Sequence, residues 1–205
     1  MNIYDEKVLP YLVNLICSSK PASKQRKKVV PYAEGEVLEI GVGSGLNFPF
    51  YDAQKITKIW ALEPSEAMQI LAKKAPRDPR LNIEFITLPS EQLPFEDNSI
   101  DTIVITFVLC TIPDVQLALQ MMYRVLKPHG KLLFAEHGRA PDKQIQFLQN
   151  LFNPLWRRVA GGCNLNRHIS NLLKEAGFTL QKDEQMYIPG FRFFSYNYWG
   201  IAVKI

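Results

Sequence analysis

The chain of 205 residues has only three cysteines, at positions 17, 110 and 163, and no C-x-x-C pair. This number and spacing predict neither a disulfide framework nor a zinc site, so we expect no bound metal and a reducing compartment. The chain also has no strong excess of either charge, since 24 lysines and arginines accompany 20 acidic residues, for a net charge of +4. Such a weak excess does not by itself indicate a nucleic-acid partner.

A long hydrophobic run is absent as well. Residues 8–16 are mostly apolar, but they fall well short of the ~20 residues that a bilayer requires. No small-residue cleavage site follows them, so we expect no signal peptide. The next residues, 20–28, are rich in lysine and arginine. We expect residues 1–30 to form a helical, basic segment that caps a pocket and turns its basic face to solvent. Peripheral contact with a membrane surface is the alternative.

The rest of the chain alternates between short apolar runs and helical segments, which is typical of a parallel sheet covered on both faces. Its length and its 47% hydrophobic residues suit one globular domain over residues 1–205. The order of these segments predicts a doubly wound α/β domain with a closing pair of strands. Strands are predicted over 36–40, 58–63, 83–87, 102–107, 131–136, 178–188 and 196–204, and helices over 65–74, 114–126, 142–152 and 167–176.

A glycine-rich turn, E-I-G-V-G-S-G-L-N, occupies residues 39–47 directly after the first predicted strand. Because glycine has no Cβ, the backbone there can turn tightly and approach a ligand closely. In open α/β sheets, ligands bind beyond the carboxyl ends of the strands at the switch point, where this turn falls. The second strand ends in Glu63, whose carboxylate can accept both hydroxyls of a ribose. A purely structural turn is the alternative, and the presence of Glu63 disfavours it.

Three nucleotide-binding patterns compete for this turn. A phosphate-binding P-loop needs G-x-x-x-x-G-K-[ST], and no Gly-Lys pair occurs here. The dinucleotide pattern G-x-G-x-x-G needs a glycine at position 46, where leucine stands, and the chain leaves little room for a separate substrate domain. The remaining form, E-x-G-x-G-x-G, places Glu39 where it would repel a pyrophosphate but could hold an ammonium group. This charge argument favours S-adenosylmethionine, which has a cationic amino-acid end and no phosphate.

Two further motifs carry a family resemblance. Residues 93–101 read L-P-F-E-D-N-S-I-D and resemble the L-P-F-x-D-N-S-F-D of small-molecule methyltransferases, and residues 124–131 read R-V-L-K-P-H-G-K and resemble their R-x-L-K-P-G-G. With the glycine turn, they make nearly the whole chain resemble a class I S-adenosylmethionine-dependent methyltransferase. The resemblance implies an α/β, doubly wound, Rossmann-like seven-stranded sheet that is mostly parallel with a C-terminal antiparallel strand. It also implies S-adenosylmethionine as cofactor and S-adenosylhomocysteine as product.

A narrower resemblance rests on four short motifs. They are T-F-V-L-C-T-I at 106–112, A-E-H at 135–137, N-P-L-W at 153–156 and G-C-N-L-N-R at 162–167. They are similar to L-V-L-C-S-V, M-E-H, D-P-x-W and G-C-x-L-x-R in the methyltransferase-like family that includes the thiol S-methyltransferases. Members of that family begin with a long hydrophobic membrane anchor, and we do not expect membrane residence to carry over to this chain.

The resemblance and the charge argument together imply a set of cofactor-binding residues. The glycine turn would border the methionine end of the cofactor, Glu63 would bind the ribose, and Pro64 and Met68 would flank the adenine. Because a proline stands where the family has an acidic contact to the adenine amino group, Ser90 or Glu91 is expected to replace it. The full set is Glu39, Gly41, Gly43, Ser44, Gly45, Asn47, Glu63, Pro64, Met68, Ser90, Glu91, Thr106 and Phe107.

The implied reaction is an in-line displacement at the methyl group, for which orientation and desolvation can supply most of the acceleration. For a thiol acceptor of pKa about 8.5, deprotonation near pH 7 costs about 2 kcal/mol. His137, just past the fifth strand, is the candidate catalytic base or substrate-orienting group, and a structural hydrogen-bonding role is the alternative. Cys110 is expected to be a buried packing residue. The aromatic segment 187–199 either lines an apolar acceptor pocket or packs in the core.

The leading function is methyl transfer to a small apolar molecule, with a thiol as first acceptor. The enzymatic alternatives are the amine head group of a phospholipid and a quinone-precursor carbon, for which residues 1–30 would dock at a membrane surface. A non-catalytic S-adenosylmethionine-binding protein is the alternative from another class. No nucleic-acid partner is expected, because the N/D-P-P-Y/F signature of amino methylation is absent. The expected location is the cytoplasm, with or without peripheral contact to a membrane.

Overall fold

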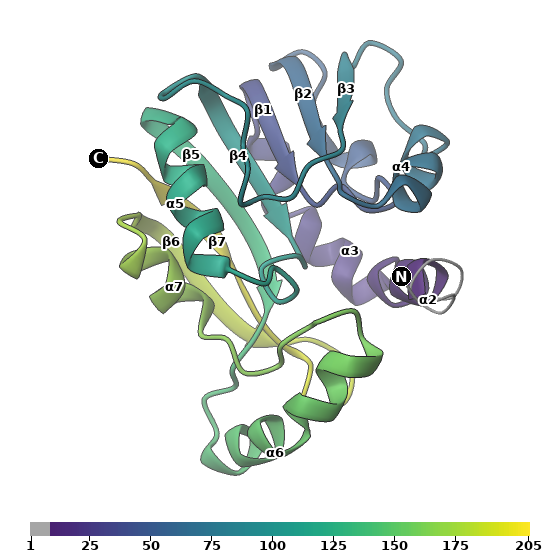
Figure 1. The fold of residues 1–205 in the computed structure, drawn as a ribbon, viewed down its shortest axis with the longest axis vertical. Coiled ribbons are helices and arrows are strands. Elements are labelled where there is room, and N and C mark those ends of the chain that lie inside the picture. The colour runs from purple at the N-terminus through teal and green to yellow at the C-terminus, as the bar shows by residue number, and fades with distance from the viewer. Residues whose placement is uncertain (1–8) are drawn as a thin grey trace.

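The computed structural model describes residues 9–205, so the expectation about a signal peptide falls partly on residues outside this range. A seven-stranded sheet in the order β3-β2-β1-β4-β5-β7-β6 forms the centre of the molecule (Figure 1). Strands β1 to β5 run parallel, and β7 runs antiparallel to both β5 and β6. The predicted doubly wound α/β fold is therefore confirmed. The strands are β1 Gly35–Ile40, β2 Ile56–Leu62, β3 Ile83–Ile86, β4 Ile100–Thr106, β5 Leu126–His137, β6 Thr179–Tyr187 and β7 Tyr196–Val203.

Helices cover both faces and the carboxyl ends of the sheet. Two of them begin beside the first residue of a predicted helix, which caps them: Ser65 Oγ accepts the N–H of Met68 at 3.4 Å, and Asp114 Oδ1 accepts the N–H of Leu117 at 3.0 Å. Each cap satisfies a helix N–H that has no partner within the helix. The helices are α2 Leu9–Cys17, α3 Lys20–Arg26, α4 Glu66–Lys73, α5 Val115–Val125, α6 Lys143–Val159 and α7 Ile169–Glu175, with short 3₁₀ turns η1 Val30–Tyr32 and η2 Phe48–Phe50.

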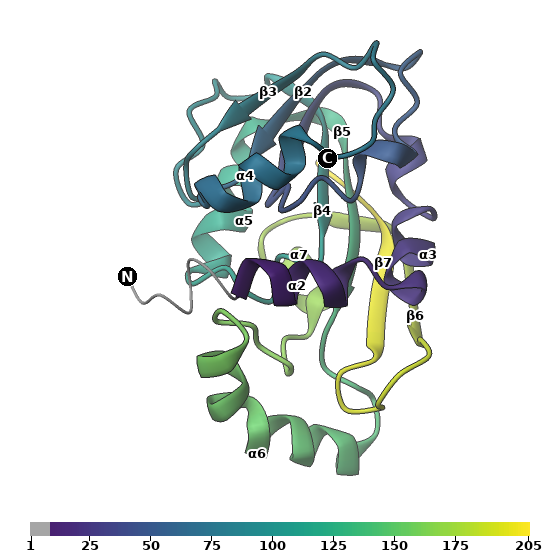
Figure 2. The ribbon, with the colours of Figure 1, turned by 90° about the vertical axis from the view of Figure 1, so that its right-hand side faces the viewer.

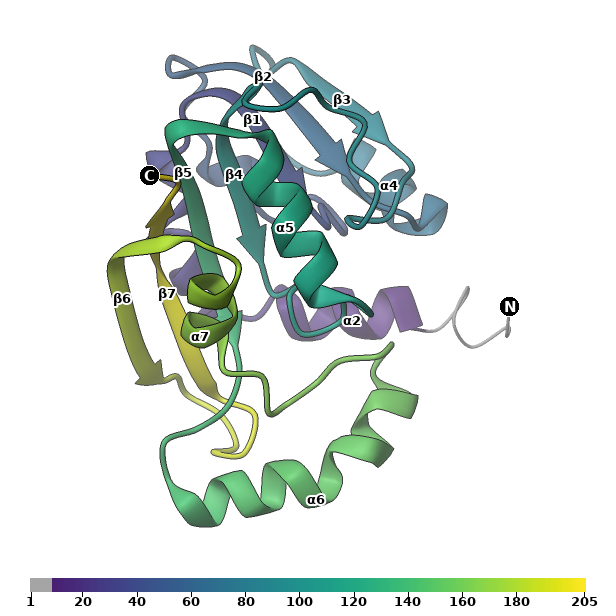
Figure 3. The same cartoon turned by 60° about the vertical axis from the view of Figure 1, so that its left-hand side comes forward.

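Alternate residues of the central strands pack into two separate cores. In β4, Ile103 and Ile105 pack with α5 and α7 on one face (Figure 3), whereas Val104 packs with η1, η2 and α4 on the other. All three side chains are fully buried. Successive side chains of a strand point to opposite faces, so burial on both faces explains why this part of the sequence is a continuous apolar run.

Helix α6 is longer than the sequence predicted. The predicted helix ends at Phe152, but Pro154 lies inside α6 and the helix continues to Val159. Two buried amides on its inner side hold it to the neighbouring loops. Gln149 accepts the N–H of Ala140 at 3.0 Å, and Asn153 accepts the N–H of Leu165 at 2.8 Å. These contacts with the loops before and after the helix offset the local tendency of proline to end a helix.

The basic segment also departs from its prediction at Arg26. Lys20, Lys24 and Lys27 are exposed as expected, but Arg26 is only 4% exposed. Its Nη1 donates to the carbonyl of Cys17 at 2.7 Å, and its guanidinium carbon lies 4.9 Å from the centre of the Phe107 ring. The expectation of a wholly solvated basic face is therefore wrong at Arg26, because α3 packs against the end of β4.

No helix within residues 9–205 is long and apolar enough to cross a membrane.

The carboxyl ends of β1 and β4 mark the switch point of the sheet. Strand β1 pairs with β2 on one side and with β4 on the other, so the connections that leave β1 and β4 diverge and a crevice opens between them. Helix α2 lies across this edge of the sheet, and α6 lies beyond it (Figure 2).

Candidate functional site

The glycine turn after β1 depends on backbone conformations that other residues rarely adopt. Gly41, Gly43 and Gly45 have φ values of 62°, 56° and 79°. The turn is tied to the sheet because the N–H of Val42 donates to the carbonyl of Leu62 at 3.0 Å. A Cβ on Gly41 would lie 2.6 Å from the Val108 side chain, whereas a Cβ on Gly43 would meet nothing closer than Met68 Cε at 3.5 Å. Gly41 is therefore required for packing, and Gly43 leaves open space beside the turn.

Glu63 joins this turn to the end of β2. One carboxylate oxygen accepts the N–H of Gly43 at 3.0 Å, and the other accepts the N–H of Ser65 at 2.9 Å. The residue is 8% exposed, and this burial raises the pKa of its carboxyl group, although the two N–H donors act in the opposite direction. The two bonds fix the orientation of the carboxylate and leave a lone pair on each oxygen for a ligand.

A cavity of about 400 Å³ opens at the carboxyl ends of β1, β2 and β4, within the size range of small-molecule sites. The structure brings together most of the residues that the sequence predicted for the cofactor site. Pro89, which stands in the place of the expected acidic contact, also lines this wall. The predicted residues in the wall are Gly41, Gly43, Ser44, Asn47, Glu63, Pro64, Met68, Ser90, Glu91, Thr106 and Phe107.

Glu39 and Gly45 are the two predicted cofactor-binding residues that do not line the cavity. Glu39 lies behind Asn47, whose Nδ2 donates to its carboxylate at 3.0 Å and also to Thr106 Oγ1 at 3.0 Å. The hydroxyl of Tyr51 donates to the other oxygen of Glu39 at 2.8 Å. Burial raises the pKa of Glu39 to about 7 despite these donors. Glu39 therefore positions Asn47 from behind the cavity wall.

The N-terminal helices supply cavity residues that the sequence analysis did not identify. Asn14, Cys17 and Arg26 all line the cavity. Ser44 in the glycine turn donates its hydroxyl to Asn14 Oδ1 at 2.5 Å, so α2 is tied directly to the predicted site. Hydrophobic periodicity does not mark the inner face of α2, because its outer face, which includes Leu15 at 71% exposure, is apolar as well.

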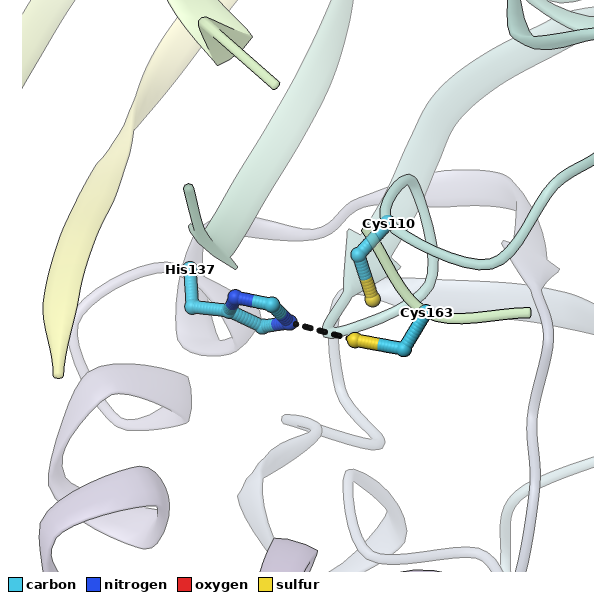
Figure 4. Close-up of side chains that lie close together, drawn as sticks. All are labelled: Cys110, His137 and Cys163. Carbon is cyan, nitrogen blue, oxygen red and sulfur yellow. Dashed lines mark hydrogen bonds between the residues drawn. The ribbon is translucent and has the colours of Figure 1, made fainter. Parts of the chain in front are cut away.

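His137, the predicted base, does not line this cavity. Its Nε2 lies 3.2 Å from Cys163 Sγ, and Cys110 lies beside both of them (Figure 4). A hydrogen bond from Cys110 and the neighbouring His137 lower the pKa of the Cys163 thiol to about 4, although burial opposes this. For His137, burial lowers the pKa of the imidazole, but the facing Cys163 outweighs this and raises it. The imidazole of His137 therefore faces the Cys163 thiol outside the cavity, and the catalytic role of His137 stays a prediction.

The aromatic segment 187–199 packs mainly within the protein. Tyr196 and Tyr198 belong to the core beside α7, and Phe194 stacks on Trp156 of α6 with ring centres 5.8 Å apart. None of these residues lines the cavity. Of the two interpretations of this segment, the positions of these side chains favour packing. Cys110 is buried, as predicted.

Comparisons with known proteins agree with this geometry. A family model described as "Methyltransferase domain" matches residues 38–134. Human thiol S-methyltransferase TMT1B is 33% identical over 191 residues, which cover 86% of this chain and 78% of that protein. The ubiquinone/menaquinone biosynthesis C-methyltransferase UbiE of Rickettsia bellii is 32% identical over 124 residues, 57% of this chain and 50% of that protein. A solved S-adenosylmethionine-dependent methyltransferase of Thermotoga maritima has a TM-score of 0.66 at 23% identity, with 99% of this chain and 98% of that chain covered.

The fold, the glycine turn and these similarities define a class I S-adenosylmethionine-dependent methyltransferase. Within that class, the chain belongs to the methyltransferase-like family that includes the thiol S-methyltransferases. The residues present suit this cofactor. The cavity wall offers a fixed carboxylate in Glu63 for a diol and open space at Gly43 for close backbone approach. The cofactor also has no phosphate that Glu63 would repel.

Proposed function

We propose that this methyltransferase transfers a methyl group from S-adenosylmethionine to a small apolar thiol. The observation that supports the acceptor most strongly is the 33% identity to a human thiol S-methyltransferase over 86% of the chain. The observation that supports the cofactor position is the Glu63 carboxylate, which is fixed by Gly43 and Ser65 in the wall of the cavity. When bound, S-adenosylmethionine supplies an activated methyl group on a sulfonium centre.

The predicted cofactor-binding residues are proposed to contact different parts of the cofactor. Glu63 holds the ribose hydroxyls, and the adenine lies against Pro64 and Met68. Ser90 and Glu91 face the adenine amino group, and the hydrogen bond between their side chains at 3.3 Å keeps both polar groups at this part of the wall. Thr106 and Phe107, at the end of β4, lie on the side where the methyl group is transferred.

Arg26 and Glu39 are proposed to provide opposite charges for the amino-acid end of the cofactor. Arg26 lines the cavity, and its buried Nε has no hydrogen-bond partner within the described part of the chain. A carboxylate is the ligand group that satisfies such a guanidinium. Glu39 acts through Asn47, which lies between it and the cavity. The methionine moiety carries one carboxylate and one ammonium group, so this arrangement is complementary to it.

Helix α2 is proposed to cap the cavity and to exclude water from the reacting groups. Leu9, Val13, Asn14 and Cys17 line the cavity from α2. A Cβ on Gly161 would lie 2.8 Å from Leu9 Cδ2, so the start of α2 lies against the turn after α6. Together they leave the acceptor in an environment of low polarity, in which a thiolate is less solvated and reacts more readily with a sulfonium.

The test is methyl transfer by the purified protein. S-adenosylmethionine is incubated with a small apolar thiol, a phospholipid amine or a quinone precursor, and the methylated product is identified by mass spectrometry. We expect the thioether and S-adenosylhomocysteine in equal amounts, and loss of both in Glu63→Ala. Methylation of the amine or the carbon acceptor in preference to the thiol would contradict the thiol proposal. Cofactor binding without transfer to any acceptor would instead favour the non-catalytic alternative.

A specific observation also supports a site of action at a membrane surface facing a reducing compartment such as the cytoplasm. In helix α6 the polar residues Gln149 and Asn153 are buried, whereas the apolar residues Phe147, Leu151 and Leu155 are exposed at 66%, 58% and 62%. Leu15 on the outer face of α2 is 71% exposed, and Figure 2 shows α2 across the carboxyl ends of the strands with α6 beyond it. Exposed arginines at 157 and 158 and lysines at 20 and 24 accompany these apolar residues. Apolar side chains with nearby cations are typical of contact with an anionic lipid surface.

Liposome flotation tests this second proposal. The wild-type protein is expected to float with anionic phosphatidylserine vesicles and less with neutral phosphatidylcholine vesicles. Replacing both Leu151 and Leu155 by serine should abolish flotation while cofactor binding is retained. Recovery of the wild-type protein at the bottom of the gradient with both vesicle types would contradict the proposal.

A further inference from the structure

Three sulfur and nitrogen donors converge at a place that the cofactor cavity does not use. Cys110 lies in the loop after β4, His137 ends β5 and Cys163 lies in the loop after α6. Figure 4 shows the three side chains pointing toward one another. Cys163 Sγ lies 3.2 Å from His137 Nε2, and the donor atoms of all three residues lie within 4.8 Å of one another. Each residue comes from a different motif of the narrower resemblance, and none of them has a role in the cofactor site.

We propose that Cys110, His137 and Cys163 bind a thiophilic divalent cation of the Zn²⁺ class. In a tetrahedral site with Zn–S near 2.3 Å and Zn–N near 2.0–2.1 Å, neighbouring donor atoms lie about 3.5–3.8 Å apart. The three donors of this chain lie within 4.8 Å of one another, and one pair is 3.2 Å apart, so small side-chain rotations are sufficient to seat an ion. Two thiolates and an imidazole favour zinc over magnesium or calcium, which prefer oxygen ligands.

Contacts around the cluster fix the backbone of all three donors. Asn164 donates its backbone N–H at 2.8 Å and its Nδ2 at 2.9 Å to the carbonyl of Cys110, which joins the two loops that carry the cysteines. His137 pairs with Asn197 in the β5–β7 ladder. The N–H of Cys163 donates to the carbonyl of Ala160 at 3.1 Å. The protein therefore pays little conformational entropy on binding an ion, since the donors already lie close together.

The three residues leave the fourth tetrahedral position open. Within residues 9–205, no fourth cysteine, histidine, aspartate or glutamate joins the group. Three protein ligands with an open position are typical of zinc sites that also bind water or an exogenous molecule. The buried Nδ1 of His137 has no hydrogen-bond partner in the described part of the chain, so the ring is held only through Nε2, the atom that would bind the ion.

The first test uses the metal alone. The purified protein is equilibrated with Zn²⁺ in a phosphine reductant, loosely bound metal is removed, and bound zinc is measured by mass spectrometry. We expect about one zinc per chain, and at least a 100-fold loss of affinity in Cys163→Ser and in His137→Ala. Cys17→Ser is the matched control, because it removes a cysteine outside the cluster, and it should retain the zinc. Equal zinc binding by folded Cys163→Ser and by the wild type would overturn the proposal.

A second test needs only the wild-type chain, in case a variant does not fold. Iodoacetamide labelling with and without Zn²⁺ is followed at each cysteine by peptide mapping. We expect Zn²⁺ to slow the labelling of Cys110 and Cys163 at least tenfold and to leave Cys17 unchanged. Replacing Zn²⁺ by Co²⁺ should give the intense thiolate-to-cobalt absorption of a tetrahedral site. Labelling rates that Zn²⁺ does not change, together with no such absorption, would overturn the proposal independently of any variant.

Discussion

The Glu63 carboxylate accepts the backbone N–H of Gly43 at 3.0 Å, and this bond locks the glycine turn after β1 to the end of β2. A second bond, from the N–H of Ser65, prevents the carboxylate from turning away. The acidic residue at the end of the second strand therefore has two functions in this structure. It holds the turn in place, and it presents two carboxylate oxygens to the part of the cavity where the ribose is expected.

The two glycines before and after Val42 should respond differently to substitution. Both have positive φ, so each alanine substitution carries a backbone cost of about 1 kcal/mol. Gly41→Ala also forces its Cβ against Val108, so we expect a further loss of about 1–3 kcal/mol of stability. Gly43→Ala has no such clash and should mainly weaken S-adenosylhomocysteine binding. Thermal unfolding and calorimetry separate the two effects, and equal thermal stability of the two variants would contradict this assignment.

Removal of the Arg26 guanidinium should weaken cofactor binding. In Arg26→Met, the cofactor carboxylate loses a charged partner, and we expect a loss of about 1.5–3 kcal/mol in S-adenosylhomocysteine affinity. Lys24→Met is the matched control, because it removes a positive charge from the exposed side of the same helix. Calorimetric titration measures both variants. An unchanged affinity in folded Arg26→Met would show that this arginine has only a structural role.

Glu39 should make stability depend on pH in the direction opposite to a surface carboxylate. Burial raises its pKa from 4.5 to about 7, so the unfolded chain loses this proton first as pH rises. The contribution of protonated Glu39 to the free energy of unfolding is therefore complete below pH 4.5. It falls by about 3 kcal/mol as the pH rises to 7. Glu39→Gln cannot ionise, so its stability relative to the wild type should improve between pH 5 and pH 8. Parallel pH profiles of the two proteins in urea unfolding would contradict the raised pKa.

In α6 a buried glutamine and an exposed leucine lead to an unusual expectation for stability. Gln149 is fully buried and bonds to the backbone at Ala140, Gly138 and Phe193. Gln149→Leu leaves these groups without partners and should cost about 2–4 kcal/mol, whereas Leu155→Gln on the exposed face should change stability by less than about 0.5 kcal/mol. Urea unfolding measures both. A larger loss in Leu155→Gln would contradict the orientation of this helix.

The parts of the fold that the sequence predicted are those coded by local patterns. Short apolar runs predicted the strands, because the strands of a sheet that is buried on both faces consist of continuous apolar residues. Two helices begin where the sequence predicted, next to Ser65 and Asp114, because these N-caps act within one turn. The glycine turn and Glu63 lie together in the cavity wall as the sequence predicted, because their spacing reflects the fixed geometry of a β-α-β unit.

The parts that the sequence did not predict depend on contacts between distant segments. Arg26 belongs to a run of exposed cations, and only the packing of α3 against Phe107 shows that it is buried. Helix α6 passes Pro154 because its buried amides bond to the loops before and after it and to the carbonyl of Phe193. Cys110 and Cys163 come from two separate loops and His137 from the end of β5, so no short spacing marks their convergence. Tertiary packing, rather than local propensity, determines each of these features.

The central claim is that Glu63 anchors S-adenosylmethionine in the cavity beside the glycine turn. Calorimetric titration with S-adenosylhomocysteine of the wild type, Glu63→Ala and the control Glu66→Ala, which removes an exposed carboxylate from α4, tests it most directly. The account predicts a micromolar dissociation constant, about −8 kcal/mol, for the wild type and the control. It also predicts binding at least 100-fold weaker in folded Glu63→Ala. No binding by the folded wild type, or equal affinity in Glu63→Ala, would contradict it.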